Sequence, residues 1–284
     1  MKPVLALVVT VVEGDLELAS DALWGLGVVA VEERRLRGKT GICELWTSLG
    51  DDSQAVVRAL SGFLGLWPYR FEPVDPAVSE TWREFAVPTW VDDDTVIYPA
   101  WLAAPTSNAL YRIAIEPGVT FGMGDHPTTV LTTRAMRRLI DPQRPVDVLD
   151  VGCGSGVLAI AACIFGATTA YGIDIAEAAI PTTLHNAQLN GVSAQVTVST
   201  EDLRDISGAY GLVLANILAP TIIALADDLL RVLSPTGTLI ISGILADSHD
   251  HVLRALRPLK VTATDEWNGW VAVTLERGTK GNNR

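Results

Sequence analysis

Three alternating glycines, Gly152, Gly154 and Gly156, follow directly after an apolar run in the middle of the chain. Glycine at such positions lets backbone N–H groups approach a ligand closely, as they do in sites for nucleotide-type cofactors. A second apolar run ends in Asp174, about twenty residues further on, where a carboxylate commonly accepts hydrogen bonds from ribose hydroxyls. The pattern therefore predicts a site for a cofactor that carries a ribose.

The spacing of the glycines distinguishes two kinds of cofactor. The dinucleotide fingerprint has a third glycine three positions after the second, but Val157 occupies that position here. S-adenosylmethionine has no pyrophosphate to dock at the helix N-terminus, and a loop of alternating glycines suits it. We therefore predict that Gly152, Gly154 and Gly156 bind S-adenosylmethionine, which favours a methyltransferase over an NAD-dependent enzyme.

Four carboxylates follow the predicted strands around this loop. Asp174 is predicted to contact the ribose, and the alternative is a role as N-cap of the following helix. Asp150 ends the strand before the loop, where it would either hold the ammonium group of the methionine moiety or accept hydrogen bonds from loop amides. Glu201 and Asp202 follow the third strand, and would either accept a hydrogen bond from the adenine amino group or lie in a solvated turn.

Asn216 is the polar residue that ends the apolar run at residues 212–215. An amide oxygen at this position can accept a hydrogen bond from an incoming amine and direct the amine lone pair toward a methyl carbon. We predict that Asn216 is the catalytic residue and also contacts the cofactor. The alternative is that Asn216 caps the helix that begins near Pro220.

Residues 121–129 form another candidate part of the site. Two glycines, a proline at the start of a helix and paired threonines predict a tight loop whose exposed amides and hydroxyls can meet a carboxylate. The methionine moiety of S-adenosylmethionine carries such a carboxylate. For His126, within this loop, we predict a structural role rather than a catalytic one.

A parallel sheet would bring these residues together, because ligands of such sheets bind beyond the carboxyl ends of the strands. From Pro127 onward, helical and extended patterns alternate regularly. Helices are expected at residues 128–139, 157–165, 177–189, 220–233 and 248–256. Strands are expected at residues 146–151, 170–174, 195–199, 212–215, 238–242, 260–265 and 270–276. This alternation predicts an α/β fold: a seven-stranded, doubly wound, mostly parallel sheet of the methyltransferase type whose last hairpin adds an antiparallel strand.

The N-terminal part of the chain has a pattern of its own. Strands are expected at residues 4–12, 28–32, 42–46 and 69–74, and helices at residues 16–26 and 53–66. This order predicts a small α+β domain of the ferredoxin-like type. Because it holds no cluster of candidate catalytic groups, we predict an accessory or recognition module rather than a second active site.

The chain is therefore expected to comprise four segments. They are a substrate-recognition domain at 1–72, a linker and tryptophan-rich entry segment at 73–118, a methyltransferase domain at 119–278 and a disordered tail at 279–284. Pro73 and Pro76, among acidic residues, mark the first boundary. Two short strands, at residues 95–98 and 111–115, are expected to cover the entrance to the methyltransferase domain.

Composition restricts the classes of function. A net charge of −12 disfavours a free-standing nucleic-acid binder, and is compatible with a basic partner or with a solubilising surface. No apolar run is long enough to cross a bilayer, and the run at residues 4–12 is followed by acidic residues, so we expect a buried strand rather than a signal peptide. The three cysteines form neither an even set nor a metal-ligand spacing, and we expect a cytoplasmic protein without disulfides or a metal.

Taken together, the motifs resemble a known family. The segments occur in the order FGMGDHPTT, DVLDVGCGSGVLAIAA, GIDI, LANILAP, LIISGIL and EWNGWVAVTLER, and resemble those of the bacterial ribosomal protein L11 methyltransferases. The resemblance covers the chain from about residue 113 onward and is weaker in the N-terminal part.

The resemblance implies an enzyme that methylates lysine side-chain and N-terminal amines of a large-subunit ribosomal protein, with an N-terminal domain that grips this substrate. We expect methylation before assembly and no nucleic-acid or membrane partner. The resemblance also implies that the S-adenosylmethionine contacts fall on Thr129, Gly152, Asp174 and Asn216. Two alternatives remain open. One is the same chemistry on another protein or on a small amine, and the other is a degenerate methyltransferase fold that serves as a binding module.

The chain departs from the family pattern in a few places. Met123 stands where the family commonly has threonine, and Ala176-Glu177 stand where an Asp-Pro pair is usual. Pro181 lies early in the following helix, which is tolerated only if that helix begins late. None of these departures removes a predicted cofactor contact.

Overall fold

The computed structural model describes residues 4–16, 19–20, 23, 30–36, 41–48, 67–74, 83, 86–106, 109–116, 122–247 and 249–277. The chain forms two compact units. The first consists of Met1–Ala86 and Val119–Phe121, and the second consists of Val87–Gly118 and Gly122–Arg284. The expected boundaries at residues 72, 118 and 278 and the roles assigned to these segments stay predictions.

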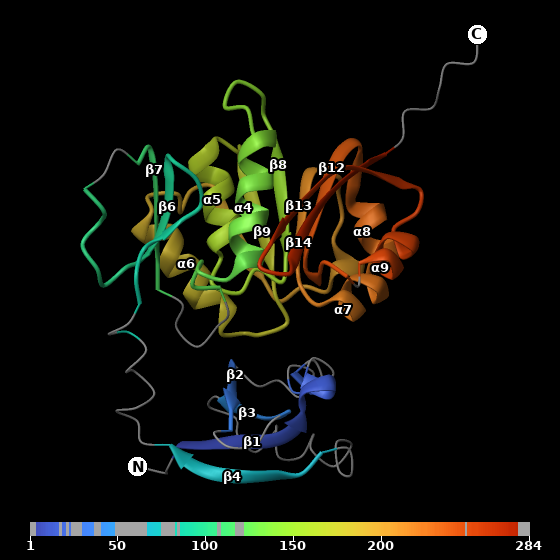
Figure 1. The fold of residues 1–284 in the computed structure, drawn as a ribbon. Helices are drawn as coiled ribbons and strands as arrows, with labels where there is room; N and C mark the ends of the chain where they lie inside the picture. Colours follow the sequence, from blue (N-terminus) through green and yellow to red (C-terminus); the bar gives the residue numbers. More distant parts are fainter. Residues whose placement is uncertain are drawn as a thin grey trace. The chain divides into compact units, whose positions relative to one another are not determined.

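The first unit contains a four-stranded antiparallel sheet in the order β2-β3-β1-β4 (Figure 1). The strands are β1 (Val4–Val12), β2 (Ala30–Arg35), β3 (Ile42–Ser48) and β4 (Tyr69–Val74), and a short 3-10 helix (Glu13–Asp15) follows β1. The most apolar strand, β1, lies between two others, and the order is typical of ferredoxin-like domains. The helix expected at residues 53–66 and most of that at 16–26 lie outside the described residues.

The second unit is built on a seven-stranded sheet in the order β10-β9-β8-β11-β12-β14-β13. Its strands are β8 (Asp147–Val151), β9 (Thr169–Ile173), β10 (Val196–Ser199), β11 (Tyr210–Asn216), β12 (Leu233–Leu245), β13 (Leu259–Trp267) and β14 (Trp270–Arg277). Strand β14 pairs antiparallel with β12 and β13, whereas the remaining pairs are parallel. The predicted α/β fold with its antiparallel final hairpin is confirmed.

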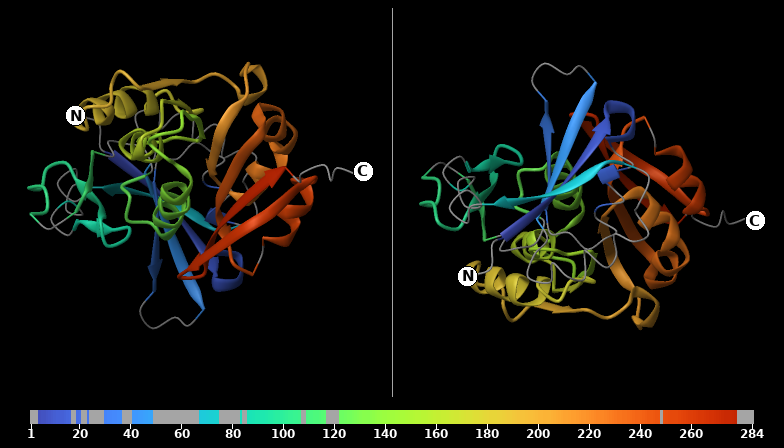
Figure 2. Two further views of the ribbon diagram at one scale, coloured as in Figure 1. Left: turned by 90° about the horizontal axis from the view of Figure 1, so that it is seen from above. Right: turned by 90° about the horizontal axis from the view of Figure 1, so that it is seen from below.

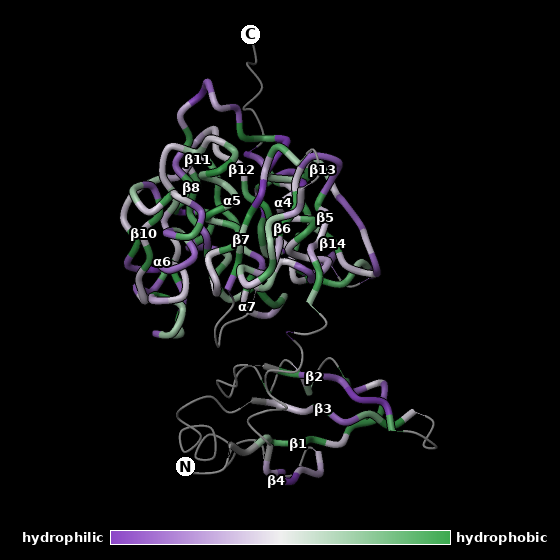
Figure 3. The backbone as a smooth tube through the Cα atoms, turned by 90° about the vertical axis from the view of Figure 1, so that its left-hand side faces the viewer, coloured by the Kyte–Doolittle hydropathy of each residue, from purple (hydrophilic) through white to green (hydrophobic). Residues whose placement is uncertain are grey.

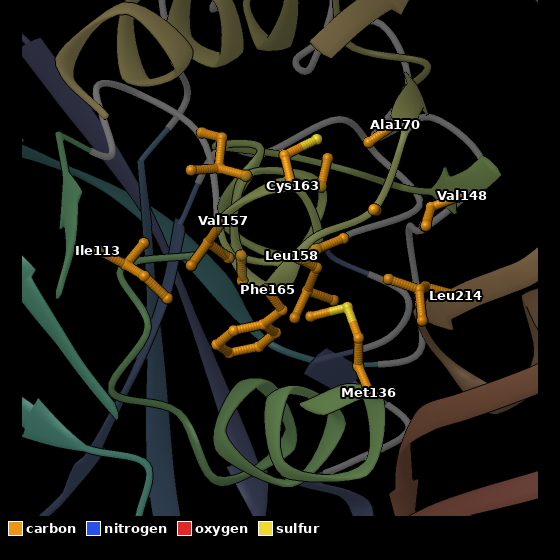
Figure 4. Close-up of a cluster of buried hydrophobic side chains, with 14 of the residues drawn as sticks. Ile113, Met136, Val148, Val157, Leu158, Cys163, Phe165, Ala170 and Leu214 are labelled. Atoms are coloured by element: carbon orange, nitrogen blue, oxygen red, sulfur yellow. The ribbon is translucent and has the colours of Figure 1, made fainter. Parts of the chain in front are cut away.

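Both faces of this sheet are buried. Along β11, Leu212 and Leu214 join one hydrophobic cluster, whereas Val213 and Ala215 join the other, because successive side chains of a strand point to opposite faces. Figure 4 shows the first cluster, in which side chains of the sheet pack against helices α4 and α5. A strand buried on both faces has little surface left for polar groups, so chemistry must take place at the strand ends.

Two sets of helices cover the sheet (Figure 2). The helices are α4 (Pro127–Leu139), α5 (Val157–Phe165), α6 (Ala179–Leu189), α7 (Ala219–Ala224), α8 (Ala226–Val232) and α9 (Asp250–Ala255). Buried residues of α4, α5 and α6 belong to one cluster, and those of α7, α8 and α9 belong to the other. Pro181 is the third residue of α6, whose late start makes this proline tolerable.

The expectation of one helix over residues 220–233 is wrong. The structure has two helices, α7 and α8, because the backbone of Leu225 departs from helical geometry, with φ −95° and ψ 5°. Asp227 and Asp228 then lie in the first turn of α8, where negative charge favours a new helix N-terminus.

Strand β12 is longer than expected. Tyr210 pairs with Leu233 and Leu212 pairs with Thr238, so the segment between Leu233 and Thr238 bulges out of the ladder. Residues 234–237, which lie between an expected helix and an expected strand, are accommodated as an irregularity within the strand.

A small three-stranded sheet lies beside the helices of the second unit. It contains β5 (Thr89–Trp90), β6 (Thr95–Pro99) and β7 (Tyr111–Ile115), with β6 and β7 parallel. Both expected strands are present, and the two-residue β5 is an addition. Ile113 and Ile115 of β7 are buried in the core cluster that includes α5, and the ring of Tyr111 meets that of Phe165 edge to face at 5.1 Å.

The distribution of hydropathy follows this architecture. In Figure 3 the hydrophobic segments include the central strands of the second unit. In the part of the chain that the structure describes, no helix is long and apolar enough to cross a membrane.

Candidate active site

Three neighbouring parallel strands bring the predicted site residues to one edge of the sheet. Val151 of β8 lies in register between Ile173 of β9 and Ala215 of β11. The next residue along each strand is Gly152, Asp174 or Asn216. These three residues therefore emerge side by side, as the sequence predicts for the carboxyl ends of a parallel sheet.

The glycine loop turns tightly because its glycines adopt the left-handed conformation, with φ of 76°, 53° and 79° at Gly152, Gly154 and Gly156. At Gly152, packing adds a second constraint, since a Cβ atom would lie 2.4 Å from Cγ2 of Ile217. Gly156 is the N-cap of α5 and has no side chain with which to satisfy the amides of that helix. The backbone amides in the first turn of α5 therefore need a hydrogen-bond acceptor from another residue.

Asp150 supplies that acceptor. Its Oδ2 atom accepts a hydrogen bond from the amide of Ala159, in the first turn of α5, at 3.2 Å. The carboxyl is almost completely buried, and its Oδ1 atom has no hydrogen-bond partner. Burial raises the pKa of Asp150 to about 7, the hydrogen bond from Ala159 lowers it, and the negative charge of Asp174 raises it further.

Asp174 is anchored by the backbone on both sides. Oδ2 accepts from the amide of Gly154 at 2.8 Å, and Oδ1 accepts from the amide of Ala176 at 2.9 Å. The N-cap of α6 is Ala178, so the alternative role of Asp174 as helix cap is wrong. Because each carboxylate oxygen can accept two hydrogen bonds, Asp174 retains acceptor capacity for a pair of hydroxyls.

Asn216 presents a side-chain amide without a hydrogen-bond partner among the described residues. The residue is half-buried, and the N-cap of α7 is Leu218, so the alternative role of Asn216 as helix cap is also wrong. The following residue, Ile217, is held between two glycines, since a Cβ atom at Gly152 or Gly243 would collide with it. This packing fixes the backbone beside Asn216 while leaving its amide available.

The loop that precedes α4 is tied to the glycine loop. Oγ of Ser155 donates a hydrogen bond to the carbonyl of Gly122 at 2.5 Å. Thr129, at the start of α4, is fully buried, and its Oγ1 atom has no hydrogen-bond partner. Among the described residues only three buried side-chain polar atoms lack a partner, and two of them are on Asp150 and Thr129.

His126 has the predicted structural role. Its Nδ1 atom accepts from the amide of Thr128, which makes His126 the N-cap of α4, and its ring meets that of Trp270 edge to face at 5.0 Å. Burial lowers the pKa of His126, although Asp125 opposes this shift. A capping imidazole whose ring is packed against a tryptophan is poorly placed to act as a general base.

The two acids after β10 are engaged within the protein. Glu201 accepts from Oη of Tyr171 at 2.8 Å, and Asp202 caps a short 3-10 helix (Leu203–Asp205) through the amide of Arg204. These contacts favour the reading of both residues as turn acids over a role in binding adenine.

Cys153 packs inside the glycine loop, where burial raises the pKa of its thiol well above the usual range. The described cysteines are free thiols, all buried. No three His, Cys, Asp or Glu residues among the described part of the chain lie close enough to hold a metal ion.

Asn186 of α6 and Asn190, the C-cap residue of that helix, contribute to this region, although neither is a candidate from the sequence. Asn186 donates to the carbonyl of Ser155, within the glycine loop, at 2.9 Å. Asn190 lies one helical turn later and binds the backbone of Ala114 in β7. The signal in the sequence is the pair of asparagines four residues apart on one helix face, which alone does not say what the pair would bind.

The family model of ribosomal protein L11 methyltransferase (PrmA) matches residues 74–278. This match covers the glycine loop, Asp174, Asn216 and the loop before α4. The chain belongs to the ribosomal protein L11 methyltransferase family. Membership in this family confirms the predicted resemblance and the predicted class of S-adenosylmethionine-dependent methyltransferase.

Individual relatives extend the likeness over both units. The ribosomal protein L11 methyltransferase of Symbiobacterium thermophilum is 34% identical over 263 residues, which is 92% of this chain and 81% of that protein. That of Halalkalibacterium halodurans is 35% identical over 240 residues, 81% of this chain and 76% of that protein. A crystal structure of ribosomal protein L11 methylase from Lactobacillus delbrueckii subsp. bulgaricus is 29% identical with a TM-score of 0.62, and the match covers 67% of this chain and 98% of that one.

Proposed function

We propose that this methyltransferase transfers methyl groups from S-adenosylmethionine to amines of ribosomal protein L11. The observation that carries the proposal is the row formed by Gly152, Asp174 and Asn216 at one sheet edge, in a chain that belongs to this family. The row combines a loop suited to the cofactor, an acceptor suited to ribose hydroxyls and a free amide suited to an amine.

The groups that line this edge fit S-adenosylmethionine. Gly152, Gly154 and Gly156 let the backbone approach it, and Asp174 retains acceptor capacity for the ribose hydroxyls. The methionine moiety carries an ammonium and a carboxylate. The unpartnered Oδ1 atom of Asp150 would accept a hydrogen bond from the ammonium. We assign the unpartnered hydroxyl of Thr129 to the same end of the cofactor.

Asn216 would orient the acceptor amine. Its amide oxygen accepts a hydrogen bond from the amine N–H, which directs the nitrogen lone pair toward the donor. S-adenosylmethionine supplies a methyl carbon on a sulfonium sulfur, and this C–S bond breaks as the N–C bond forms. The lysine ammonium must first release a proton to water, because only the uncharged amine has a lone pair to donate, and the methylated amine then carries the positive charge that the sulfonium loses.

The first unit would recognise the protein substrate. It presents a folded sheet without candidate catalytic groups among its described residues, so binding is the role that suits it. The net charge of −12 complements a basic ribosomal protein, which increases the rate of encounter between the two. We propose that methylation precedes assembly of the ribosomal protein into its subunit, with no contact to nucleic acid.

The test has two stages. Calorimetric titration of the protein with S-adenosylmethionine measures whether the donor binds, and absence of binding would favour a degenerate fold that serves as a binding module. Labelled S-adenosylmethionine is then incubated with the enzyme and large-subunit proteins separated from RNA. We expect the label on L11, with a reaction lacking enzyme as the control; label on another protein or on a small amine would overturn the proposed substrate.

A further inference from the structure

The outer edge of β7 is bound by side chains instead of by a strand. One edge of β7 pairs with β6, while the backbone groups of Ala114, and of Glu116 directly after the strand, bind the side chains of Asn190 and Asn186. Asn190 accepts from the amide of Ala114 at 2.9 Å and donates to its carbonyl at 2.7 Å. Asn186 accepts from the amide of Glu116 and donates to its carbonyl, both at 2.9 Å.

These two asparagines have matching hydrogen bonds, because a side-chain amide offers one carbonyl acceptor and two N–H donors, like a peptide group with a spare donor. They differ in the partner of that spare donor and in burial, since Asn186 is fully buried and Asn190, the C-cap residue of α6, is half-buried. In Asn190 the spare donor binds the carbonyl of Asn186, four residues earlier, at 2.8 Å. In Asn186 it binds the carbonyl of Ser155, between Gly154 and Gly156, at 2.9 Å.

Ser155 joins three parts of the second unit. Its carbonyl accepts from Asn186, and its hydroxyl donates to the carbonyl of Gly122 in the loop before α4. Both Ser155 and Asn186 are fully buried, so water cannot replace a lost donor at this carbonyl. The end of β7, the glycine loop and the loop before α4 are therefore fixed by one continuous set of hydrogen bonds.

We propose that Asn186 is a positioning residue for the methyl donor. It acts through the Ser155 carbonyl, which sets the orientation of the peptide between Ser155 and Gly156 and with it the path of the loop that faces the cofactor. This inference rests on the proposed function, because it assigns the glycine loop to S-adenosylmethionine. Asn190, one turn away, binds Ala114 of β7 and the carbonyl of Asn186 instead of the glycine loop.

The matching bonds allow a matched test. Asn186→Asp and Asn190→Asp each replace two donors by an acceptor on an isosteric side chain. We expect Asn186→Asp to raise the Kd and KM for S-adenosylmethionine at least tenfold, roughly the effect of one unsatisfied buried carbonyl. At saturating donor, kcat should change by less than about threefold. For Asn190→Asp, the Kd should stay within about twofold of the wild-type value, while its urea midpoint falls by less than that of Asn186→Asp, because Asn190 is half-buried.

Equal Kd values for the two variants, or an unchanged Kd in Asn186→Asp, would overturn the inference, because Asn186 binds the carbonyl of Ser155 in the glycine loop and the bonds of Asn190 go to Ala114 and Asn186. If the charged variants do not fold, Asn186→Ser and Asn190→Ser remove the same donors without adding charge and are compared in the same way. A wild-type protein that does not bind S-adenosylmethionine would instead refute the proposed function.

Discussion

The two main sheets of this protein expose their polar groups in different places. In the seven-stranded sheet both faces are buried, and the polar residues Asp150, Asp174 and Asn216 lie where strands end. In the four-stranded sheet one face packs into a core that includes Leu7 and Val9, while the other carries charged and aromatic side chains. The ends of a parallel sheet suit a small ligand, whereas an open face of an antiparallel sheet suits a large one.

The open face of the four-stranded sheet is organised around Trp46. The guanidinium of Arg34 lies 4.1 Å from the centroid of the Trp46 ring, and that of Arg70 lies 5.7 Å away. The indole N–H of Trp46 donates to Glu44 at 3.0 Å, and Arg70 pairs with Glu44 at 2.9 Å. Aromatic and arginine side chains that are fixed in this way are the residues that most often dominate protein interfaces.

The strongest way to test this comparison is to remove the amide at the end of β11. Asn216→Ala should lower kcat by about 100-fold, because the acceptor amine loses its orientation, and leave the Kd for S-adenosylmethionine within about threefold. Single-turnover methylation of L11 measures the first effect, and calorimetry measures the second. Turnover at the wild-type rate would show that the strand end does not carry the chemistry.

The buried carboxyl of Asp150, at the end of β8, should lower the stability of the ligand-free protein at neutral pH. The pKa of Asp150 is about 7 in the folded protein, against 3.8 for an ordinary aspartate, so the folded state keeps a proton that the unfolded chain has already lost. The contribution of the protonated Asp150 carboxyl to stability is fully present below about pH 4 and is lost as the pH rises through 7. Relative to wild type, Asp150→Asn should therefore gain roughly 3 kcal/mol in stability as the pH rises from 5 to 8, because each of the two pH units up to the pKa of about 7 is worth about 1.4 kcal/mol.

Urea unfolding of both proteins at the two pH values measures this difference. Glu44→Gln is the control from the open face, where the carboxylate is paired with Arg70, and it should show no such gain. Parallel pH profiles for wild type and Asp150→Asn would mean that the buried carboxyl is not protonated in the folded state.

The open face should affect the protein substrate and not the methyl donor. Trp46→Ala is expected to raise the KM for L11 about tenfold, because a central aromatic residue of an interface commonly contributes more than 1 kcal/mol. The Kd for S-adenosylmethionine should not change. If the KM for L11 stays the same, the substrate binds elsewhere; if the donor affinity falls, the two sheets do not have separate roles.

The smallest effect is expected at the end of β10. Glu201→Gln keeps an acceptor for Oη of Tyr171, so the Kd for S-adenosylmethionine should change by less than about threefold. A loss greater than tenfold would restore the alternative in which Glu201 binds the adenine amino group. Isothermal titration at one pH is sufficient for this comparison.

The site could be predicted from the sequence where it depends on local pattern. Strand ends followed by glycine or a polar residue located Gly152, Asp174 and Asn216, and the parallel sheet brings all three together. The cap alternatives for Asp174 and Asn216 were ambiguous because both residues are common N-caps, and helix ends cannot be placed to within two residues from the sequence. The structure begins α6 after Ala178 and α7 after Leu218, which removes both alternatives.

By itself, the sequence determined the order of strands and helices, the kind of cofactor and the family. These depend on the periodicity of apolar residues and on glycine spacing, which are local properties of the chain. Only the tertiary structure decided that Asp150 is buried with one oxygen unpartnered and that Asn186 holds the carbonyl of Ser155, 31 residues earlier. Burial and hydrogen bonding between distant residues depend on how the elements pack, and no local pattern specifies that packing.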